Sequence, residues 1–364
     1  MIKSSDVGSL PFFGDATRFL SGAMCFKRFS EEGSSEYFER IVVKGFIDKI
    51  EAGIDVPSYP QFRDMNKMFL GMIDGVEDTK MGHMETSRLS LKADRQQIPE
   101  VAVIRENSQR IYRKTGRAFK AKVCITGPYT LSSLFVYRDE GIFRRLGEVV
   151  VKIVESSAFD NRHGRVELVT IDEPVFGLQD DPLIDYGSEG RENLREAWES
   201  VFYKVHSKGA RGCLHLHNTT DDLFWEVGSL DVIESHMDDP IYTMKKTEEQ
   251  LEAADKFLKA SLCTMNFDRL IENRIVTTSK QVLSESAINQ EIAEIWRGIS
   301  DRKVNPAIFV DNVQLMEERL MRVVRRFGVG RIPYAGPECG LKGFPSYHCA
   351  LECLRRVSAA VSKR

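Results

Sequence analysis

Short runs of β-branched and aliphatic residues alternate with longer amphipathic segments along most of the 364-residue chain. The short runs have the length and composition of buried strands, and they predict eight strands, at 2–9, 54–59, 120–126, 166–172, 212–217, 230–236, 259–266 and 331–335. Between them, apolar residues recur at spacings of three and four, which predicts helices at 35–52, 141–159, 192–207, 247–257, 279–299 and 313–327.

Eight strands, most of them followed by a helix, predict an α/β protein with a (β/α)8 TIM barrel that spans 1–364 as a single domain. A doubly wound open sheet is the alternative, but Gly8-Ser9-Leu10-Pro11 is not the Gly-rich phosphate-binding turn that such a sheet carries after an early strand. Residues 60–118 exceed the length of one crossover helix, and they predict a helical insertion after the second strand. The apolar run 306–311 predicts a short strand in the last long connection.

Composition and charge narrow the function classes. The chain has 51 Lys and Arg against 54 Asp and Glu, interleaved along its length, and 42% hydrophobic residues. This balance lacks the basic footprint of a nucleic-acid or membrane partner. The chain begins without the apolar stretch of a secretion signal, and its seven cysteines are scattered. We therefore expect a soluble, cytoplasmic, globular protein with reduced thiols.

Candidate chemistry gathers where the predicted strands end, which is where TIM barrels carry their functional residues. Side chains alternate along a strand, so His215 and His217 share one face of their strand, as Glu234 and His236 do on the next strand. Cys339 follows the last strand directly. Imidazole, thiol and carboxylate groups that converge on one barrel mouth suit Zn2+, which takes mixed nitrogen, sulfur and oxygen ligands.

Each of these residues also has a purely structural interpretation. A His-x-His pair occurs in strands with ordinary hydrogen bonds, and Cys339 could be a small buried residue. Asp172 and Glu173 end a strand together, and buried acids need a partner or a function. Asp172 could equally cap the helix that follows it.

Five motifs, in order over nearly the whole chain, carry a family resemblance. The sequence resembles the C-terminal catalytic barrel of cobalamin-independent methionine synthase, and it looks closest to the stand-alone core methionine synthases of archaea and some bacteria. The motifs are Val7-Gly8-Ser9-Leu10-Pro11, Ile125-Thr126-Gly127-Pro128-Tyr129-Thr130, Ile171-Asp172-Glu173-Pro174, Leu214-His215-Leu216-His217 and Gly336-Pro337-Glu338-Cys339-Gly340-Leu341-Lys342. The second motif makes Tyr129 a candidate substrate-binding residue.

The resemblance implies a zinc-dependent transfer of a methyl group to a thiol, with homocysteine as the acceptor and methionine as the product. Matched by position, His215 and Cys339 correspond to zinc ligands of the family. Val7 and Ser9 correspond to residues that bind the amino acid, through a backbone carbonyl and at the carboxylate respectively. Asp172 corresponds to the acid that holds the amino group, which makes it a candidate catalytic residue as well as a candidate substrate-binding residue.

The chain departs from the family pattern at several of these positions. The family reads His-x-Cys where this chain has His217. The glutamate ligand of the family falls on His236 by strand register, or on Glu234 if the strand shifts by two residues. The second acid around the amino group is Tyr59 here, and the histidine thought to relay protons is Asn266, which makes Asn266 a candidate catalytic residue.

The methyl donor is a further departure. Long bacterial enzymes of the family carry a second, N-terminal barrel that helps to hold polyglutamyl folate, and the Trp that stacks on the pterin falls at Leu134. We therefore expect a methyl-corrinoid donor, carried by a partner protein, rather than methyl-folate. Two alternatives stay open: a methylcorrinoid:coenzyme M-type methyltransferase, whose acceptor lacks an amino group, and a degenerate barrel that binds a corrinoid protein or a methionine precursor without turnover.

Overall fold

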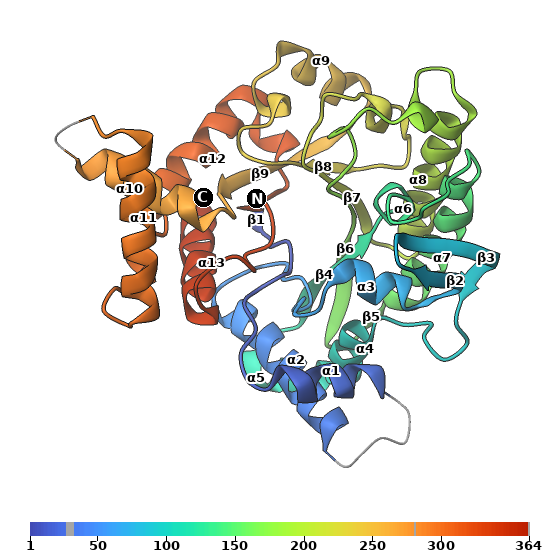
Figure 1. Cartoon of the computed structure of the whole chain (residues 1–364), viewed down its shortest axis with the longest axis horizontal. Helices are drawn as coiled ribbons and strands as arrows, with labels where there is room; N and C mark the ends of the chain where they lie inside the picture. The colour runs from blue at the N-terminus through green and yellow to red at the C-terminus, as the bar shows by residue number, and fades with distance from the viewer. Residues whose placement is uncertain (27–32, 280–281, 363–364) are drawn as a thin grey trace.

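A curled parallel sheet forms the centre of the molecule (Figure 1), in a computed structural model that describes residues 1–26, 33–279 and 282–362. Its seven strands pair in the order β1-β10-β9-β8-β7-β6-β4, and every pairing along this path is parallel. The strands are β1 (Lys3–Ser4), β4 (Phe119–Thr126), β6 (Gly164–Glu173), β7 (Arg211–Leu216), β8 (Val232–Glu234), β9 (Phe257–Cys263) and β10 (Tyr334–Pro337). A two-residue strand, β5 (Asp160–Asn161), adds an antiparallel pairing to β6.

The predicted strand at 54–59 is reduced to isolated bridges between the two edges of this sheet. Val56 bridges to Ser5 beyond β1, and Ser58 bridges to Lys122 of β4. Two features limit regular pairing here: Pro57 has no N–H group, and the N–H of Ser58 donates to the Asp6 carboxylate at 2.7 Å. The arrangement is consistent with a TIM-like barrel.

Helices surround the sheet, most of them packed on its outside, while the pair at residues 267–278 and 285–300 projects at one side (Figure 1). They are α1 (Ala16–Met24), α2 (Ser34–Glu51), α6 (Pro128–Ser132), α7 (Ile142–Ser157), α8 (Glu189–Ser207), α9 (Lys245–Ala253), α10 (Phe267–Thr278), α11 (Glu285–Ser300), α12 (Val313–Phe327) and α13 (Tyr347–Ser362), with 3-10 turns at Pro182–Ile184, Leu223–Glu226, Pro240–Tyr242, Pro306–Ile308 and Val329–Arg331. The six predicted helices correspond to α2, α7, α8, α9, α11 and α12. None of the helices in the described part of the chain has the length and apolar character needed to span a membrane.

Two sequence expectations about helix ends and strands need correction. The predicted helix at 279–299 includes residues 280–281, which lie outside the described residues, and α11 starts later because the Ser284 side chain accepts from the backbone N–H of Ala287. The strand expected at 306–311 is wrong. A 3-10 turn begins there at Pro306, after Asn305 accepts from the N–H of Ala307.

The segment 60–118 is mixed rather than helical, so the expected helical insertion is not confirmed. It contains the short helices α3 (Met65–Leu70), α4 (Pro99–Glu106) and α5 (Ser108–Thr115) and an antiparallel hairpin of β2 (Ile73–Thr79) with β3 (Gly82–Leu91). The hairpin turn is closed by Thr79, whose hydroxyl donates to the carbonyl of Gly82 at 2.8 Å. Gly82 has a φ of 145°, which favours glycine.

A buried ion pair ties α2 to the first strand and its neighbour. The side chain of Lys49 has no exposed surface, and its Nζ donates to Asp6 Oδ2 at 2.7 Å. The same Nζ donates to the carbonyl oxygens of Gly8 at 2.9 Å and Ser58 at 3.0 Å. Burial lowers the pKa of Lys49, and the Asp6 carboxylate opposes that shift. Lys49 thereby connects α2 to the residues that follow β1 and to Ser58, which bridges to β4.

Replacing Lys49 should therefore destabilise the protein strongly. Lys49→Met leaves the Asp6 carboxylate buried without its counter-charge, and we expect the free energy of unfolding to fall by about 3–5 kcal/mol. Lys44→Met on the same helix removes an exposed pair with Asp48 and should cost less than about 1 kcal/mol. Urea unfolding of both variants measures the difference. Equal losses for the two variants would contradict this role of the Lys49–Asp6 pair.

Candidate metal centre

The register of two parallel strands brings three histidines together. His215 on β7 lies opposite Glu234 on β8, so two residues further on His217 comes level with His236. The rings of His217 and His236 lie 4.1 Å apart between centroids, and those of His215 and His217 lie 5.2 Å apart. Cys339 reaches the same place from the segment directly after β10.

These four side chains form a group that could hold a metal ion. One ligand atom from each of His215, His217, His236 and Cys339 lies within 4.8 Å of the others. In a tetrahedral zinc site, with zinc–nitrogen bonds of about 2.1 Å and zinc–sulfur bonds of about 2.3 Å, neighbouring nitrogen and sulfur ligands are about 3.6 Å apart. Cys339 Sγ and His217 Nε2 are 3.6 Å apart. The donor set and its spacing therefore fit zinc after a small contraction.

The hydrogen bonding of the histidines also fits a cation. Both ring nitrogens of His215 are buried without a hydrogen-bond partner among the described residues, and so is His236 Nε2. A buried nitrogen left in this state costs free energy that a bound cation would remove. Carboxylates flank both sides of the His215 ring, with Asp172 Oδ1 3.8 Å from Nε2 and Glu234 Oε1 3.7 Å from Nδ1. A carboxylate on the far side of a ligating imidazole is a common feature of metal sites.

The pKa values of three side chains of this group determine which of them must lose a proton before a metal can bind. Burial lowers the pKa of His215 well below its usual value, and burial with the neighbouring His236 lowers the pKa of His217 to about 4. Both imidazoles are therefore neutral near pH 7, as a metal ligand must be. Burial, with the nearby Asp172, raises the pKa of the Cys339 thiol to about 12, so this thiol keeps its proton until a cation arrives.

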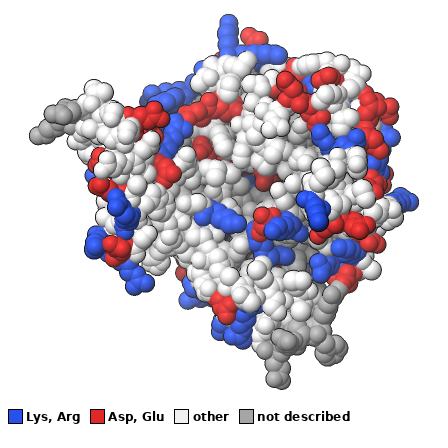
Figure 2. Space-filling view, in the orientation of Figure 1, with Lys and Arg blue, Asp and Glu red and all other residues white. Residues whose placement is uncertain are grey.

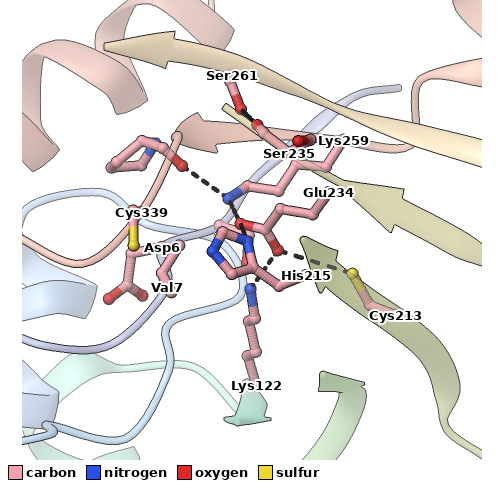
Figure 3. A network of polar contacts seen from close by, with 12 residues as sticks. Asp6, Val7, Lys122, Cys213, His215, Glu234, Ser235, Lys259, Ser261 and Cys339 are labelled. Atoms are coloured by element: carbon pink, nitrogen blue, oxygen red, sulfur yellow. Dashed lines mark hydrogen bonds and ion pairs between the residues drawn. The ribbon is translucent and has the colours of Figure 1, made fainter. Parts of the chain in front are cut away.

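Glu234 belongs to a different cluster, directly beside His215 (Figure 3). Its carboxylate accepts from Lys122 Nζ at 2.8 Å and from Lys259 Nζ, and all three side chains have no exposed surface. Burial alone would raise the pKa of Glu234, but the two lysines hold it well below its usual value. Both oxygens of Glu234 are paired to lysines, and the group of four that could hold a metal contains His236 and not Glu234.

Three predicted substrate-binding residues lie around this centre or on its supporting loops. Asp172 is the next-to-last residue of β6 and lies beside His215. One of its carboxylate oxygens has no hydrogen-bond partner among the described residues, and burial raises its pKa to about 7. The carbonyl of Val7 accepts from the Cys124 thiol at 3.0 Å. Ser9 packs against Gly340, where an added Cβ would lie 1.8 Å from the Ser9 hydroxyl, so only glycine fits beside Cys339.

Three other predicted residues form structural contacts. The Tyr59 hydroxyl is buried and donates to the carbonyl of Cys124 at 2.8 Å. Tyr129 stacks on Phe143, with 5.9 Å between ring centroids. Asn266 caps α10 by accepting from the N–H of Arg269. Their proposed roles at a substrate site gain no support from these contacts.

Sequence reasoning missed the two lysines and one glutamate that support the centre. Lys122 and Lys259 lie within β4 and β9, and a lysine inside an otherwise apolar strand is the signal that could have revealed them. Glu338 precedes Cys339, and its carboxylate accepts from the hydroxyl of Thr264 at 2.6 Å and from the N–H of Met237 at 3.0 Å. Glu338 thereby holds the Cys339 segment against the segment that follows His236.

Metal binding at this centre should depend on pH through Cys339. Between about pH 6 and pH 8 the thiol is protonated in the free protein, so zinc must displace its proton, and the apparent affinity for zinc should fall about tenfold for each unit of decrease in pH. Competition with a chromophoric chelator measures this slope. Cys339→Ser should bind zinc more weakly and with a shallower slope. A wild-type affinity that does not change with pH would exclude the thiol as a ligand.

Comparison with known proteins supports the fold. No protein-family model matches the chain, and no curated protein matches it in sequence. Among solved structures, a B12-independent methionine synthase from Shewanella sp. W3-18-1, in complex with selenomethionine, matches with a TM-score of 0.60 and 14% identity over 100% of this chain and 97% of that one. A putative vitamin-B12 independent methionine synthase from Listeria monocytogenes matches with a TM-score of 0.58 and 14% identity, over 100% and 99% of the two chains. At this identity the comparison establishes that the chain shares the fold of these two proteins.

Proposed function

We propose that the protein is a zinc-dependent methyltransferase that moves a methyl group to a thiol, with homocysteine as the acceptor and methionine as the product. The observation that carries the proposal is the group of three imidazoles and one thiol at the carboxyl ends of the barrel strands, within 4.8 Å of one another. The fold shared with a B12-independent methionine synthase and with a putative one supports the same reaction class. The archaeal-type core enzymes remain the subtype that the motifs favour.

The residues of the centre supply a low-charge ligand set. Zinc bound there would lower the pKa of a coordinated thiol and so supply a thiolate at neutral pH. The two histidines with lowered pKa values contribute no charge, and Cys339 contributes one negative charge when its proton leaves. A weakly anionic set leaves the metal a stronger Lewis acid, which favours thiolate formation but makes that thiolate a weaker nucleophile. We therefore propose that the enzyme uses a reactive methyl donor.

Asp172 is the residue best suited to hold the amino group of the acceptor. Its free carboxylate oxygen lies 3.8 Å from His215, on the rim of the metal centre. An ammonium group beside it would favour the ionised carboxylate, against the burial that raises its pKa to about 7. Binding of an amino-acid acceptor should therefore strengthen as the pH rises through about 7. Tyr59, at the position of a second acid, is committed to the carbonyl of Cys124.

For the donor we propose a methyl-corrinoid carried by a partner protein, with methyl-folate as the alternative. The support is the residue at the position of the folate-stacking Trp, which here is Leu134, a partly buried side chain packed against the hydrophobic core. An aliphatic side chain in that position offers no aromatic platform for a pterin ring. An activity assay run with methylcobalamin and with methyl-folate distinguishes the two donors.

Zinc content and methyl transfer should fail together when a ligand is removed. We expect about one zinc per chain in the wild type, measured by inductively coupled plasma mass spectrometry, and transfer of an isotope-labelled methyl group from methylcobalamin to homocysteine. His215→Ala and Cys339→Ala should lose the zinc and at least about 100-fold of the activity. Cys25→Ala removes a thiol outside the centre and should retain both.

Two results would contradict the proposal: wild-type protein that transfers methyl groups equally well without zinc, or ligand variants that fold and stay active. Transfer from methyl-folate but not from methylcobalamin would keep the reaction and overturn the proposed donor.

Asp172→Asn should separate acceptors by their amino group. The substitution removes the negative charge that faces the ammonium, so we expect the KM for homocysteine to rise about tenfold or more. 4-Mercaptobutyrate, which is homocysteine without its amino group, should react with both proteins at the same KM. Steady-state kinetics with the two thiols give this comparison. Equal losses with both acceptors would show that Asp172 acts on the histidine rather than on the amino group.

A coenzyme M-type acceptor is the second candidate, favoured by the commitment of Tyr59 to the protein core. Such an acceptor, 2-mercaptoethanesulfonate, has no ammonium group that would need two acids. A higher kcat/KM for 2-mercaptoethanesulfonate than for homocysteine would favour this candidate over methionine synthesis.

A further inference from the structure

A cavity lies next to the candidate metal centre, between α10, α12 and the end of β9. Its volume is about 670 Å³. Five arginines and a single acid line it, together with uncharged residues: Arg269, Arg319, Arg322, Arg325, Arg326 and Asp238. Figure 2 shows basic side chains gathered over α12, close to the hollow on this face of the molecule. The volume lies within the range of small-ligand sites.

Three of these arginines already have carboxylate partners. Arg319 pairs with Asp311 and also donates to the carbonyl of Leu262 at 2.7 Å, so its half-buried guanidinium is fixed against β9. Arg326 pairs with Glu248, and Arg269 pairs with Asp238. These contacts hold the walls of the cavity in position.

Arg322 and Arg325 have no such partner. Neither guanidinium forms an ion pair or a hydrogen bond within the described part of the chain, although both line the cavity with Arg319. Arg325 lies in the last turn of α12, where a positive charge stabilises the helix end, but Arg322 lies one turn earlier and has no such role. Arg322 and Arg325 are exposed and lie three residues apart on α12, so their like charges repel weakly, and an anion in the cavity would relieve that repulsion.

We propose that this cavity binds the anionic group of a small molecule, a phosphate or a carboxylate, through Arg322 and Arg325. The planar guanidinium group matches both anions because it can offer two parallel N–H donors to two oxygens. Two hydroxyl groups that line the cavity already donate their hydrogens within the protein. Ser261 donates to the carbonyl oxygen of Ser235 and Tyr242 to that of Lys259, both at 2.6 Å. The arginines are therefore the groups that select the ligand.

The cavity is joined to the metal centre by a short chain of contacts. Met237 lines the cavity and directly follows His236. The N–H of Met237 donates to Glu338 at 3.0 Å, and Glu338 directly precedes Cys339. A ligand anchored by its anionic group in the cavity is thus held beside two of the proposed metal ligands. The proposal concerns an anion site of its own and stands whether or not the centre transfers methyl groups.

Calorimetric titration of the full-length protein with two simple probes tests the proposal. Glycerol 3-phosphate stands for a phosphate ligand, and glutarate stands for a carboxylate ligand. We expect the wild type to bind at least one of them, and the double variant Arg322→Gln, Arg325→Gln to bind it at least about tenfold more weakly. The probe that binds more tightly identifies the class of ligand.

The matched control is Arg110→Gln, Arg113→Gln. These two arginines have the same spacing on α5, are exposed and lie outside the cavity, so this variant should bind as the wild type does. Cys339→Ala should also bind the probe unchanged, which separates failure of the anion site from failure of the metal centre. The proposal is overturned if neither probe binds the wild type at about 10 mM, or if the two double variants lose affinity equally.

Discussion

The rest of the site depends on one interaction, the pairing of the buried Glu234 carboxylate with Lys122 and Lys259. Three charges at zero exposure are stable only because each carboxylate oxygen has its own ammonium partner. Lys259 also donates to the carbonyl of Pro337 at 2.9 Å, which ties β9 to the strand that precedes Cys339. The cluster thereby fixes the relative positions of strands that supply the metal ligands.

The same cluster bears on which residues are free to bind a metal at the candidate centre. Glu234 is held by two cations, so the carboxylate nearest to His215 is not free to ligate. The two lysines outnumber the single glutamate, and their positive charge adds to burial in keeping His215 neutral. His236, one layer higher, faces His217 instead. The proposed ligand set is richer in imidazole and poorer in negative charge than the set that the family resemblance implies.

The sequence predicted those parts of the fold that follow from local pattern. Strand positions such as 120–126 and 212–217 and helices such as 313–327 match β4, β7 and α12 closely because hydrophobic periodicity is a local property. The hairpin of β2 and β3 escaped prediction because its polar, exposed strands do not form an apolar run. The segment 54–59 forms only isolated bridges instead of the predicted strand, because the bond from the Ser58 N–H to Asp6 is a contact between distant residues that local pattern does not reveal.

The site was predictable in its members but not in its arrangement. The identities of His215, His217, His236 and Cys339 and their place at strand ends were visible in the sequence. The choice between Glu234 and His236 was not, because a shift of two residues keeps a side chain on the same face of its strand. In the structure His215 pairs with Glu234 across β7 and β8, and the group that could hold a metal contains His236. For Tyr59, Tyr129 and Asn266 the structure shows contacts with the core or a helix cap, and their roles at a substrate site stay predictions.

The most direct test of the account is zinc-edge X-ray absorption spectroscopy of the zinc-loaded wild-type protein. The account predicts one sulfur neighbour at about 2.3 Å and three imidazole nitrogens at about 2.0–2.1 Å around each zinc. A metal shell that contains no sulfur, or that is made of carboxylate oxygens, would contradict the account. So would a protein that does not retain zinc.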